Sequence, residues 1–283
     1  QLIDSLTRSQ LSFALYRLPW TDECYLVLQK SEDVEKLNDI PGLNGKKGFV
    51  IAPFHQTEEH PIVLIRPEVT AYDWEEIIPT ITSLENTDAI LNSKPQASAP
   101  ISTLNDKERY DRYYAAFRHF MEPLKEKKFK KLVLSRPAFC PIGGEFSPLE
   151  TFVKACNDYP RMMIYLCHTP VTGTWLGSTP EILLSGCAQN WKTVALAGTL
   201  PIVDGIEPTE WSNKNKEEQA IVAEYIRKII KKHGTKMIEK GPYTARAGQL
   251  VHLKTDFLFQ QKDTKSLGNL LNELHPTPAI CGL

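Results

Sequence analysis

Residues 129–136 read Phe129-Lys130-Lys131-Leu132-Val133-Leu134-Ser135-Arg136. The run is short, rich in leucine, and alternates as a β-strand does. Because side chains on a strand alternate between its faces, Lys131 and Ser135 share one face and Leu132 lies on the other. If both faces are covered, the Lys131 ammonium loses its hydration, and the neutral amine can take a proton from water. The alternative is that Lys130 and Lys131 end the strand in solvent.

The composition is that of an ordinary globular protein. The chain has 283 residues, of which 42% are hydrophobic and 24% charged, so it can bury a sizeable core. Lys and Arg number 33 and Asp and Glu 34, which leaves a formal net charge of -1. This balance gives no bulk attraction to nucleic acid or an anionic membrane. Neither is expected as a partner, and an anionic substrate must be held by local charges.

The sequence carries no sign of a membrane span or a secretion signal. No apolar run approaches the roughly 20 residues that cross a bilayer, and the start Gln1-Leu2-Ile3-Asp4 does not resemble a signal peptide. The six cysteines are scattered, with no CxxC pair and no His/Cys ligand spacing, which indicates reduced thiols, mostly in the core. A cytoplasmic location is therefore expected.

The N-terminal part has the pattern of an antiparallel meander. Short apolar runs at 13–17, 25–29, 48–54 and 62–66 are separated by Gly, Asn and Pro. Polar, proline-containing sequence from Asn86 to Thr103 follows and indicates a linker or a long excursion. We therefore expect a strand-rich N-terminal subdomain over residues 1–100 and a second region over residues 101–283.

The second region begins with a helix and continues with strands. Apolar residues recur at helical spacing over 106–127, and the aromatic ones are expected to face the core. The run Ser147-Pro148-Leu149-Glu150 is typical of a helix start and predicts a helix to about residue 157. Strands are predicted at 161–168, 174–185, 191–197 and 249–255. Regular helical crossovers are absent from this pattern, so the sheet is expected to be antiparallel or mixed and the fold class α+β.

The clearest helix covers residues 213–233, and an acidic residue lies on its apolar stripe. Glu218 shares that stripe with Val222 and Ile229, so its carboxylate is expected to point toward the core. An unpaired carboxylate there is costly, which indicates a metal ion, a charged partner or an altered proton affinity. The alternative is a capping box between Asn215 and Glu218.

Six motifs occur in an order that resembles the chorismate-binding enzyme family. They are KLVLSR (131–136), GSTPE (177–181), ALAGT (195–199), NKEEQ (215–219), VHL (251–253) and HPTPA (275–279). The resemblance covers residue 107 to the end, and the strands before it correspond to the family's variable N-terminal region. It implies an α+β fold in which two antiparallel sheets pack together with helices outside.

The resemblance also implies a reaction. Family members add a nucleophile to C2 of chorismate with loss of the C4 hydroxyl, assisted by Mg²⁺ on the substrate carboxylate. Lysine at the position of Lys131 marks the members that use water, and no arginine-containing run follows Thr199, as it tends to do in ammonia users. The chain is thus most similar to isochorismate synthases of the menaquinone type, isomerases that supply menaquinone or siderophore synthesis. Salicylate synthase and the anthranilate or aminodeoxychorismate synthases are the alternatives within the family.

Roles are implied for individual residues by their motifs. Lys131 is the implied general base toward water, Glu181 the general acid that protonates the departing C4 hydroxyl, and Glu218 a Mg²⁺ ligand. Hydroxide is a poor leaving group, so a carboxylic acid that is kept protonated lowers the barrier. For His252 the alternative is a core histidine with satisfied hydrogen bonds. The implied substrate-binding residues are Ala197, Gly198, Thr199, His252 and Ala279.

One part of the family pattern is not in this sequence. After HPTPA the family continues with an arginine- and tyrosine-bearing stretch, a glycine-rich stretch and a second Mg²⁺-binding Glu, so the C-terminal part of the fold is expected to be missing from this chain. A non-catalytic chorismate-binding fragment is therefore the alternative from another class. Salicylate-forming members tend to carry Thr where this chain has Ala279, which favours isochorismate as the product. Chorismate is the expected partner molecule, and a monomer the expected assembly.

Overall fold

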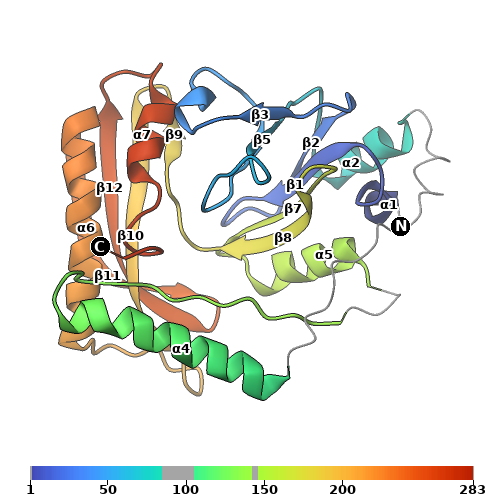
Figure 1. Cartoon of the computed structure of the whole chain (residues 1–283). Coiled ribbons are helices and arrows are strands. Elements are labelled where there is room, and N and C mark those ends of the chain that lie inside the picture. Colours follow the sequence, from blue (N-terminus) through green and yellow to red (C-terminus); the bar gives the residue numbers. More distant parts are fainter. Residues whose placement is uncertain (1, 85–104, 142–145, 283) are drawn as a thin grey trace. The chain divides into compact units, whose positions relative to one another are not determined.

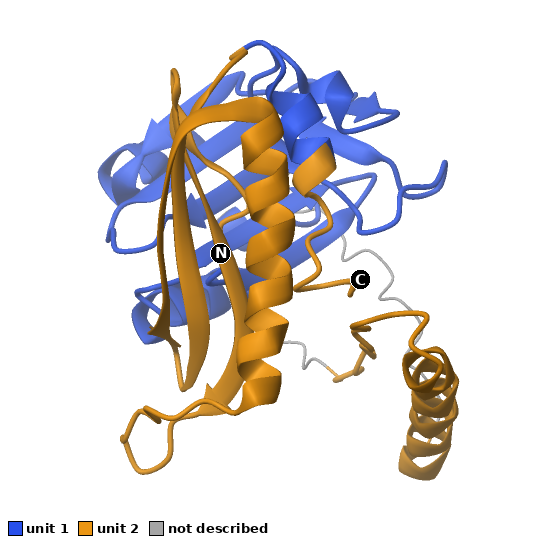
Figure 2. Cartoon of the chain, turned by 90° about the vertical axis from the view of Figure 1, so that its left-hand side faces the viewer, with its two compact units in different colours: residues 1–96, 145–181, 265–272 blue, residues 97–144, 182–264, 273–283 orange. Residues whose placement is uncertain are grey.

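Figure 1 shows the computed structural model of the chain, which describes residues 2–84, 105–141 and 146–282. The chain forms two compact units (Figure 2). Unit 1 comprises residues 1–96, 145–181 and 265–272, and unit 2 comprises residues 97–144, 182–264 and 273–283. The boundary predicted near residue 100 lies outside the described residues. Within the described part, no helix is long and apolar enough to cross a membrane.

Unit 1 is built on a five-stranded antiparallel sheet with the order β6-β2-β1-β7-β8 (Figure 1). Its strands are β1 (Ser12–Arg17), β2 (Cys24–Gln29), β6 (Val69–Tyr72), β7 (Met163–Thr169) and β8 (Gly173–Thr179). Helices α1 (Leu2–Leu6), α2 (Asp73–Thr82) and α5 (Pro148–Asp158) pack on one face of this sheet. Fully buried side chains such as Phe13, Ile77 and Phe152 fill the space between sheet and helices, and so form the main core of the unit.

The opposite face of that sheet packs against three short strands. These are β3 (Glu35–Leu37), β4 (Phe49–Ile51) and β5 (Ile62–Ile65), which form an antiparallel sheet in the order β3-β5-β4. Ile65 and Phe49 contact Ala14 and Cys167 across the interface. The four apolar runs predicted as strands are therefore strands, but they are divided between two sheets rather than joined in one meander.

Unit 2 is built on a four-stranded antiparallel sheet with the order β11-β12-β10-β9. Its strands are β9 (Ser185–Cys187), β10 (Asn190–Pro201), β11 (Gly234–Ala247) and β12 (Leu250–Gln261). The long helix α6 (Asn213–His233) packs along β10, β11 and β12 (Figure 1). Buried Gln219 of α6 donates a hydrogen bond to Thr255 of β12 at 2.6 Å, so Thr255 and, by alternation, Phe257 and Phe259 face the helix. The last helix, α7 (Leu267–Leu274), has residues in both units. These antiparallel sheets and helices confirm the α+β class.

Helix α4 (Asp106–Lys125) begins as predicted but is packed differently. Asn105 and Glu108 form a reciprocal capping box at its start. No residue of the helix is buried, and Tyr110 and Phe117 are exposed. The prediction that its aromatic side chains face the core is wrong, because helical periodicity identifies an apolar stripe but not the surface that covers it.

The stretch 129–136 has the pattern of a strand but does not form one. In the described residues its backbone pairs at one point only, an isolated antiparallel bridge between Leu132 and Gly282. A strand needs a neighbouring strand along its length, and alternation alone does not provide one. The prediction of a strand at 129–136 is therefore wrong for the structure described, although the Lys131 side chain is only 10% exposed, as a buried position requires.

Candidate active site

Three residues predicted from three different motifs meet in unit 2. The Lys131 ammonium Nζ lies 3.1 Å from Glu218 Oε1, and it donates to the carbonyl oxygen of Ala279 at 3.4 Å. The Lys131 side chain is 10% exposed and that of Glu218 26% exposed. A nearly buried cation is thus held between a carboxylate of α6 and the turn that follows α7. The sequence predicted each residue separately, and the structure brings them into direct contact.

The ion pair determines what Lys131 can do in the state described. An ammonium has no lone pair with which to accept a proton, and a neighbouring carboxylate stabilises the ammonium. Lys131 can therefore act as a base only after it loses a proton. The alternative in which Lys130 and Lys131 both end in solvent is wrong for Lys131 and right for Lys130, which is exposed.

Glu218 is positioned by the first turns of α6. The helix is capped by Ser212, whose hydroxyl accepts a hydrogen bond from the backbone N–H of Asn215 at 3.3 Å. The alternative of a capping box from Asn215 to Glu218 is therefore wrong, because the N-cap is Ser212, three residues before Asn215. Gln219 turns toward the sheet to bond Thr255, which leaves the preceding Glu218 side chain at the side of the helix, toward Lys131. The hydrogen bond between Gln219 and Thr255 was not predicted, although Gln219 lies inside the NKEEQ motif (215–219).

A β-bulge in β10 places the predicted substrate-binding residues. The register with β12 shifts between Ala197 and Thr199, with Gly198 as the extra residue. Gly198 has φ +78°, and a Cβ there would lie 3.2 Å from the Cβ of Asn215. Glycine therefore permits both the left-handed backbone and the close approach of β10 to the first turn of α6.

The bulge also re-aims Thr199 toward His252 on β12. The ring nitrogen Nδ1 of His252 lies 3.1 Å from Thr199 Oγ1 and 3.2 Å from the Gly198 carbonyl oxygen. A carbonyl can only accept, so Nδ1 carries the proton and Nε2 keeps its lone pair. Burial lowers the pKa of His252, which favours the neutral ring. The alternative of a histidine with satisfied hydrogen bonds fits this geometry, and the contact of His252 with the substrate stays a prediction.

Glu181, the predicted general acid, belongs to unit 1. It follows β8, and its backbone N–H donates to the Thr179 hydroxyl at 3.2 Å. The other predicted site residues belong to unit 2. The role of Glu181 as an acid therefore stays a prediction.

A magnesium ion at this site could bind the carboxylate of Glu218. Mg²⁺ takes oxygen ligands, keeps several waters, and is often held through one or two carboxylates and oxygens of the substrate. The Glu218 side chain is partly exposed and its Oε1 is paired with Lys131. Over residues 2–84, 105–141 and 146–282, no three His, Cys, Asp or Glu side chains lie together as a metal site. The donor set fits a hydrated ion shared with a substrate carboxylate.

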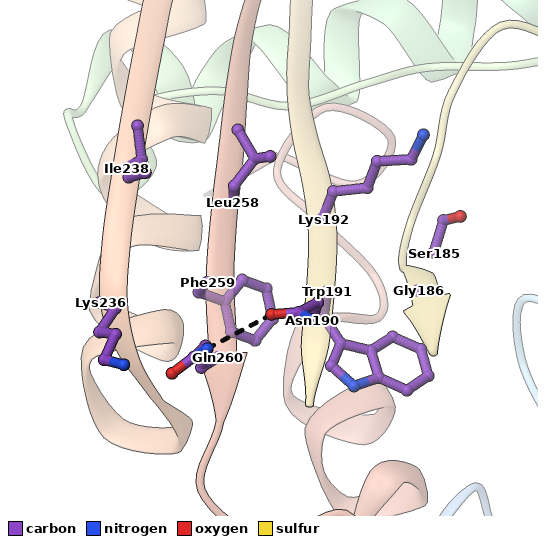
Figure 3. A pocket seen from close by; sticks show the side chains of 10 residues that line it. All are labelled: Ser185, Gly186, Asn190, Trp191, Lys192, Lys236, Ile238, Leu258, Phe259 and Gln260. Carbon is purple, nitrogen blue, oxygen red and sulfur yellow. Dashed lines mark hydrogen bonds between the residues drawn. The ribbon is translucent and has the colours of Figure 1, made fainter. Parts of the chain in front are cut away.

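A separate pocket of about 560 Å³ lies at the other end of the same sheet (Figure 3). It is lined by side chains from β9 to β12, among them Trp191, Lys192, Lys236, Ile238, Leu258 and Phe259. None of the predicted site residues lines it. Lys192 and Thr199 are seven positions apart on β10, roughly 20 Å of extended strand, so this pocket is distinct from the candidate active site.

Comparison with known proteins identifies the family. The sequence profile described as "Chorismate binding enzyme" matches residues 49–283, so the match begins earlier in the chain than residue 107. Isochorismate synthase 2 of Arabidopsis thaliana, a chloroplastic protein, is 27% identical over 180 residues, which are 60% of this chain and 32% of the relative. Isochorismate synthase MenF of Bacillus subtilis is 23% identical over 238 residues, 80% of this chain and 50% of the relative.

Solved structures resemble this chain in their fold. DhbC of Bacillus anthracis, assigned as a 2,3-dihydroxybenzoate-specific isochorismate synthase, superposes with a TM-score of 0.71 at 18% identity, over 99% of this chain and 77% of that one. The chain spans about a third to a half of the length of the curated relatives it matches. Because the family profile covers most of the sequence, this chain belongs to the chorismate-binding enzyme family.

Proposed function

We propose that the protein containing this chain is a Mg²⁺-dependent isochorismate synthase. It adds water to C2 of chorismate and releases the C4 hydroxyl as water, so that the net reaction is an isomerisation. The observation that carries the proposal is the contact of Lys131 with Glu218 and the Ala279 carbonyl. This contact joins the lysine typical of water-using members to the implied metal ligand, in a family whose matched relatives are named isochorismate synthases.

The residues of the site support the required charge changes. Chorismate carries two carboxylates, and a nearly buried ammonium such as Lys131 favours an anionic ligand. When bound, the magnesium ion supplies positive charge to the substrate carboxylate. Lys131, once deprotonated, takes the proton of the water that attacks C2, while Glu181 gives a proton to the departing hydroxyl. In the reverse reaction the two residues exchange roles.

The wall formed by β10 and β12 orients the substrate in this proposal. Ala197 and Gly198 are buried and would contribute backbone groups to the substrate, and the Thr199 hydroxyl donates or accepts a hydrogen bond. His252 holds Thr199 in place through its ring nitrogen Nδ1. A neutral His252 adds no charge to the wall.

Isochorismate rather than salicylate is the proposed product. Ala279 contacts Lys131 through its backbone carbonyl, and alanine at this position, where salicylate-forming members tend to carry Thr, supports this product. Salicylate formation would release pyruvate from isochorismate. A lactate dehydrogenase assay should therefore detect pyruvate much more slowly than isochorismate accumulates, and equal rates would assign the protein to the salicylate-forming members.

The decisive assay offers the protein both nucleophiles. Chorismate, Mg²⁺ and an ammonium salt are incubated with the protein, and the products are separated by liquid chromatography. Isochorismate should form and anthranilate, detected by fluorescence, should not. Binding of chorismate without conversion would instead support the non-catalytic alternative. We further propose that the product serves menaquinone or siderophore synthesis in the cytoplasm. Expression of the protein in strains that lack the isochorismate synthase of one pathway or the other, followed by measurement of growth, would test this.

A further inference from the structure

Two cysteines from distant parts of the sequence meet in the core of unit 1. Cys24 is the first residue of β2 and is 3% exposed, whereas Cys156 lies in the last turn of α5 and is half-buried. Both pack in the core cluster between the sheet and its helices, and their thiols are hydrogen-bonded. The expectation that most of the six cysteines are core thiols is wrong, because only Cys24 and Cys167 are buried.

A buried arginine fixes positive charge beside this pair. Arg17 lies opposite Cys24 in the β1–β2 register and is 2% exposed. Its Nη atoms donate to backbone carbonyls at 2.7 to 3.3 Å, three of which directly follow α5; the acceptors are Leu18, Thr21, Tyr159, Pro160 and Met162. Its Nε–H is buried and has no hydrogen-bond partner among the described residues. A buried N–H without an acceptor is costly, and a thiolate beside it would satisfy both its hydrogen bond and the charge.

The surroundings make the two sulfur atoms unequal. The hydrogen bond from Cys24, together with the charge of Arg17, lowers the pKa of Cys156 to about 7. The same hydrogen bond and burial raise the pKa of Cys24, and the negative charge of Asp73 at the start of α2 adds to this effect. Of the two, Cys156 is therefore the cysteine that ionises more readily, and Cys24 is the thiol donor.

We propose that Cys156 and Cys24 form an oxidisable dithiol, in which Cys156 attacks a hydroperoxide and Cys24 then closes a disulfide. In the first step the Cys156 thiolate attacks one oxygen of hydrogen peroxide, the O–O bond breaks, and the products are the sulfenic acid, which keeps that OH group, and hydroxide, which becomes water with the proton that Cys156 lost on ionisation. In the second step the Cys24 sulfur displaces the sulfenic oxygen as water, and its proton leaves with that oxygen. Two thiols and one peroxide give one disulfide and two waters. The disulfide would join β2 to α5 across the core.

The other cysteines lack this combination and serve as internal comparisons. Cys167 is buried without a cysteine partner, and burial raises its pKa to about 12. Cys140 and Cys187 are exposed. The thiol of Cys281 donates to the Thr277 carbonyl oxygen at 3.2 Å, which does not stabilise a thiolate.

Oxidation followed by peptide mapping tests the pair. The reduced protein is treated with hydrogen peroxide at neutral pH, the remaining thiols are blocked with N-ethylmaleimide, and the digest is analysed by mass spectrometry. A linked Cys24–Cys156 peptide should form first and disappear on reduction. In Cys24→Ser, Cys156 should stop as a sulfenic acid that dimedone traps, whereas Cys167→Ser should still form the linked peptide. If Cys140 and Cys187 are oxidised while Cys156 stays reduced, the proposal is wrong.

The pH dependence of alkylation gives a second test that needs only wild-type protein to begin. The rate for Cys156 with iodoacetamide should rise with a midpoint near neutral pH, well below that of free cysteine in the same buffer. Cys24→Ala removes the hydrogen-bond donor and should move the midpoint upward. Cys24→Ser keeps a hydroxyl donor and should move it less. Equal midpoints for Cys156 in the wild-type protein and for free cysteine would overturn the proposal.

Discussion

The Lys131 ammonium and the Glu218 carboxylate are 3.1 Å apart and neutralise each other. The family resemblance implies that Lys131 is a base and Glu218 a metal ligand, and an ammonium paired with a carboxylate cannot act as a base. A divalent cation at Glu218 would compete with Lys131 for the carboxylate and repel the ammonium. The ion pair and metal binding would therefore draw on the same carboxylate.

Lys131→Ala should remove most of the rate in both directions. Loss of general-base assistance typically costs about 10²- to 10⁴-fold, and the reverse reaction needs the same residue as an acid. Initial rates from chorismate and from isochorismate, each with Mg²⁺, measure the loss. Lys130→Ala is the matched control, because Lys130 is adjacent and exposed. Near wild-type rates for Lys131→Ala would exclude it as the group that activates water.

Glu218→Gln should raise the Mg²⁺ concentration needed for half-maximal activity. The amide is a weaker ligand than the carboxylate and leaves the Lys131 ammonium without its counter-charge, so the free energy of unfolding should also fall by about 1–3 kcal/mol. A Mg²⁺ titration of activity and a urea unfolding curve measure the two effects. Glu217→Gln, on the exposed neighbouring residue, should change neither. An unaltered Mg²⁺ titration in Glu218→Gln would place the metal elsewhere.

Gly198→Ala should be more damaging than Gly205→Ala. Both glycines have positive φ, +78° and +76°, so alanine at either is strained by roughly 1–2 kcal/mol. An alanine Cβ at 198 also meets Asn215, whereas nothing lies within 4 Å of one at 205. The first substitution should therefore displace α6 and lower activity, and the second should lower only stability. Equal losses of activity and stability in the two variants would show that the contact with α6 has no effect.

The stability of the chain should fall as the pH falls below the ordinary histidine pKa. His168 is fully buried, and burial lowers its pKa. The unfolded chain then binds more protons than the folded one, so the contribution is complete above about pH 6.5 and is lost progressively below it. Burial lowers the pKa of His252 and His275 as well, in the same direction.

Urea unfolding at several pH values checks this dependence. His168 lies within hydrogen-bonding distance of Thr174 Oγ1 (2.9 Å) and the Ser9 carbonyl oxygen (3.3 Å), and glutamine offers a donor and an acceptor without titrating. His168→Gln should therefore show a smaller decrease in the free energy of unfolding between neutral and mildly acidic pH. An identical decrease in wild type and variant would mean that His168 is protonated equally in the folded and unfolded states.

The sequence predicted those helices and strands for which several local patterns indicate the same structure. Helix α6 has a cap, a stripe and a basic last turn, and it was predicted with its bounds. Strand β11 was missed, because its sequence is mostly polar and contains Gly241-Pro242; an edge position tolerates both, and two register shifts absorb the irregularity. The strand prediction for residues 129–136 was wrong for the opposite reason. The sequence has a good strand pattern, but among the described residues its backbone pairs only at the bridge between Leu132 and Gly282.

The sequence predicted which residues belong to the candidate site but not how they contact one another. Motif order identified Lys131, Glu218 and Ala279, whose contact depends on segments distant in sequence. The Gln219–Thr255 hydrogen bond gave no sequence signal beyond a polar residue at a helical core position. The pairing of Cys24 with Cys156 had none, because cysteine spacing reports pairs only when they are close in the chain.

The most direct test of the central claim follows the oxygen at C2. Chorismate is converted by the protein with Mg²⁺ in water enriched in oxygen-18, and the isochorismate is analysed early in the reaction by mass spectrometry. Addition of water at C2 with departure of the C4 hydroxyl predicts one heavy oxygen atom in each new product molecule. Isochorismate without the label would mean that the hydroxyl moves within the substrate, and the water-activating role of Lys131 would then be contradicted.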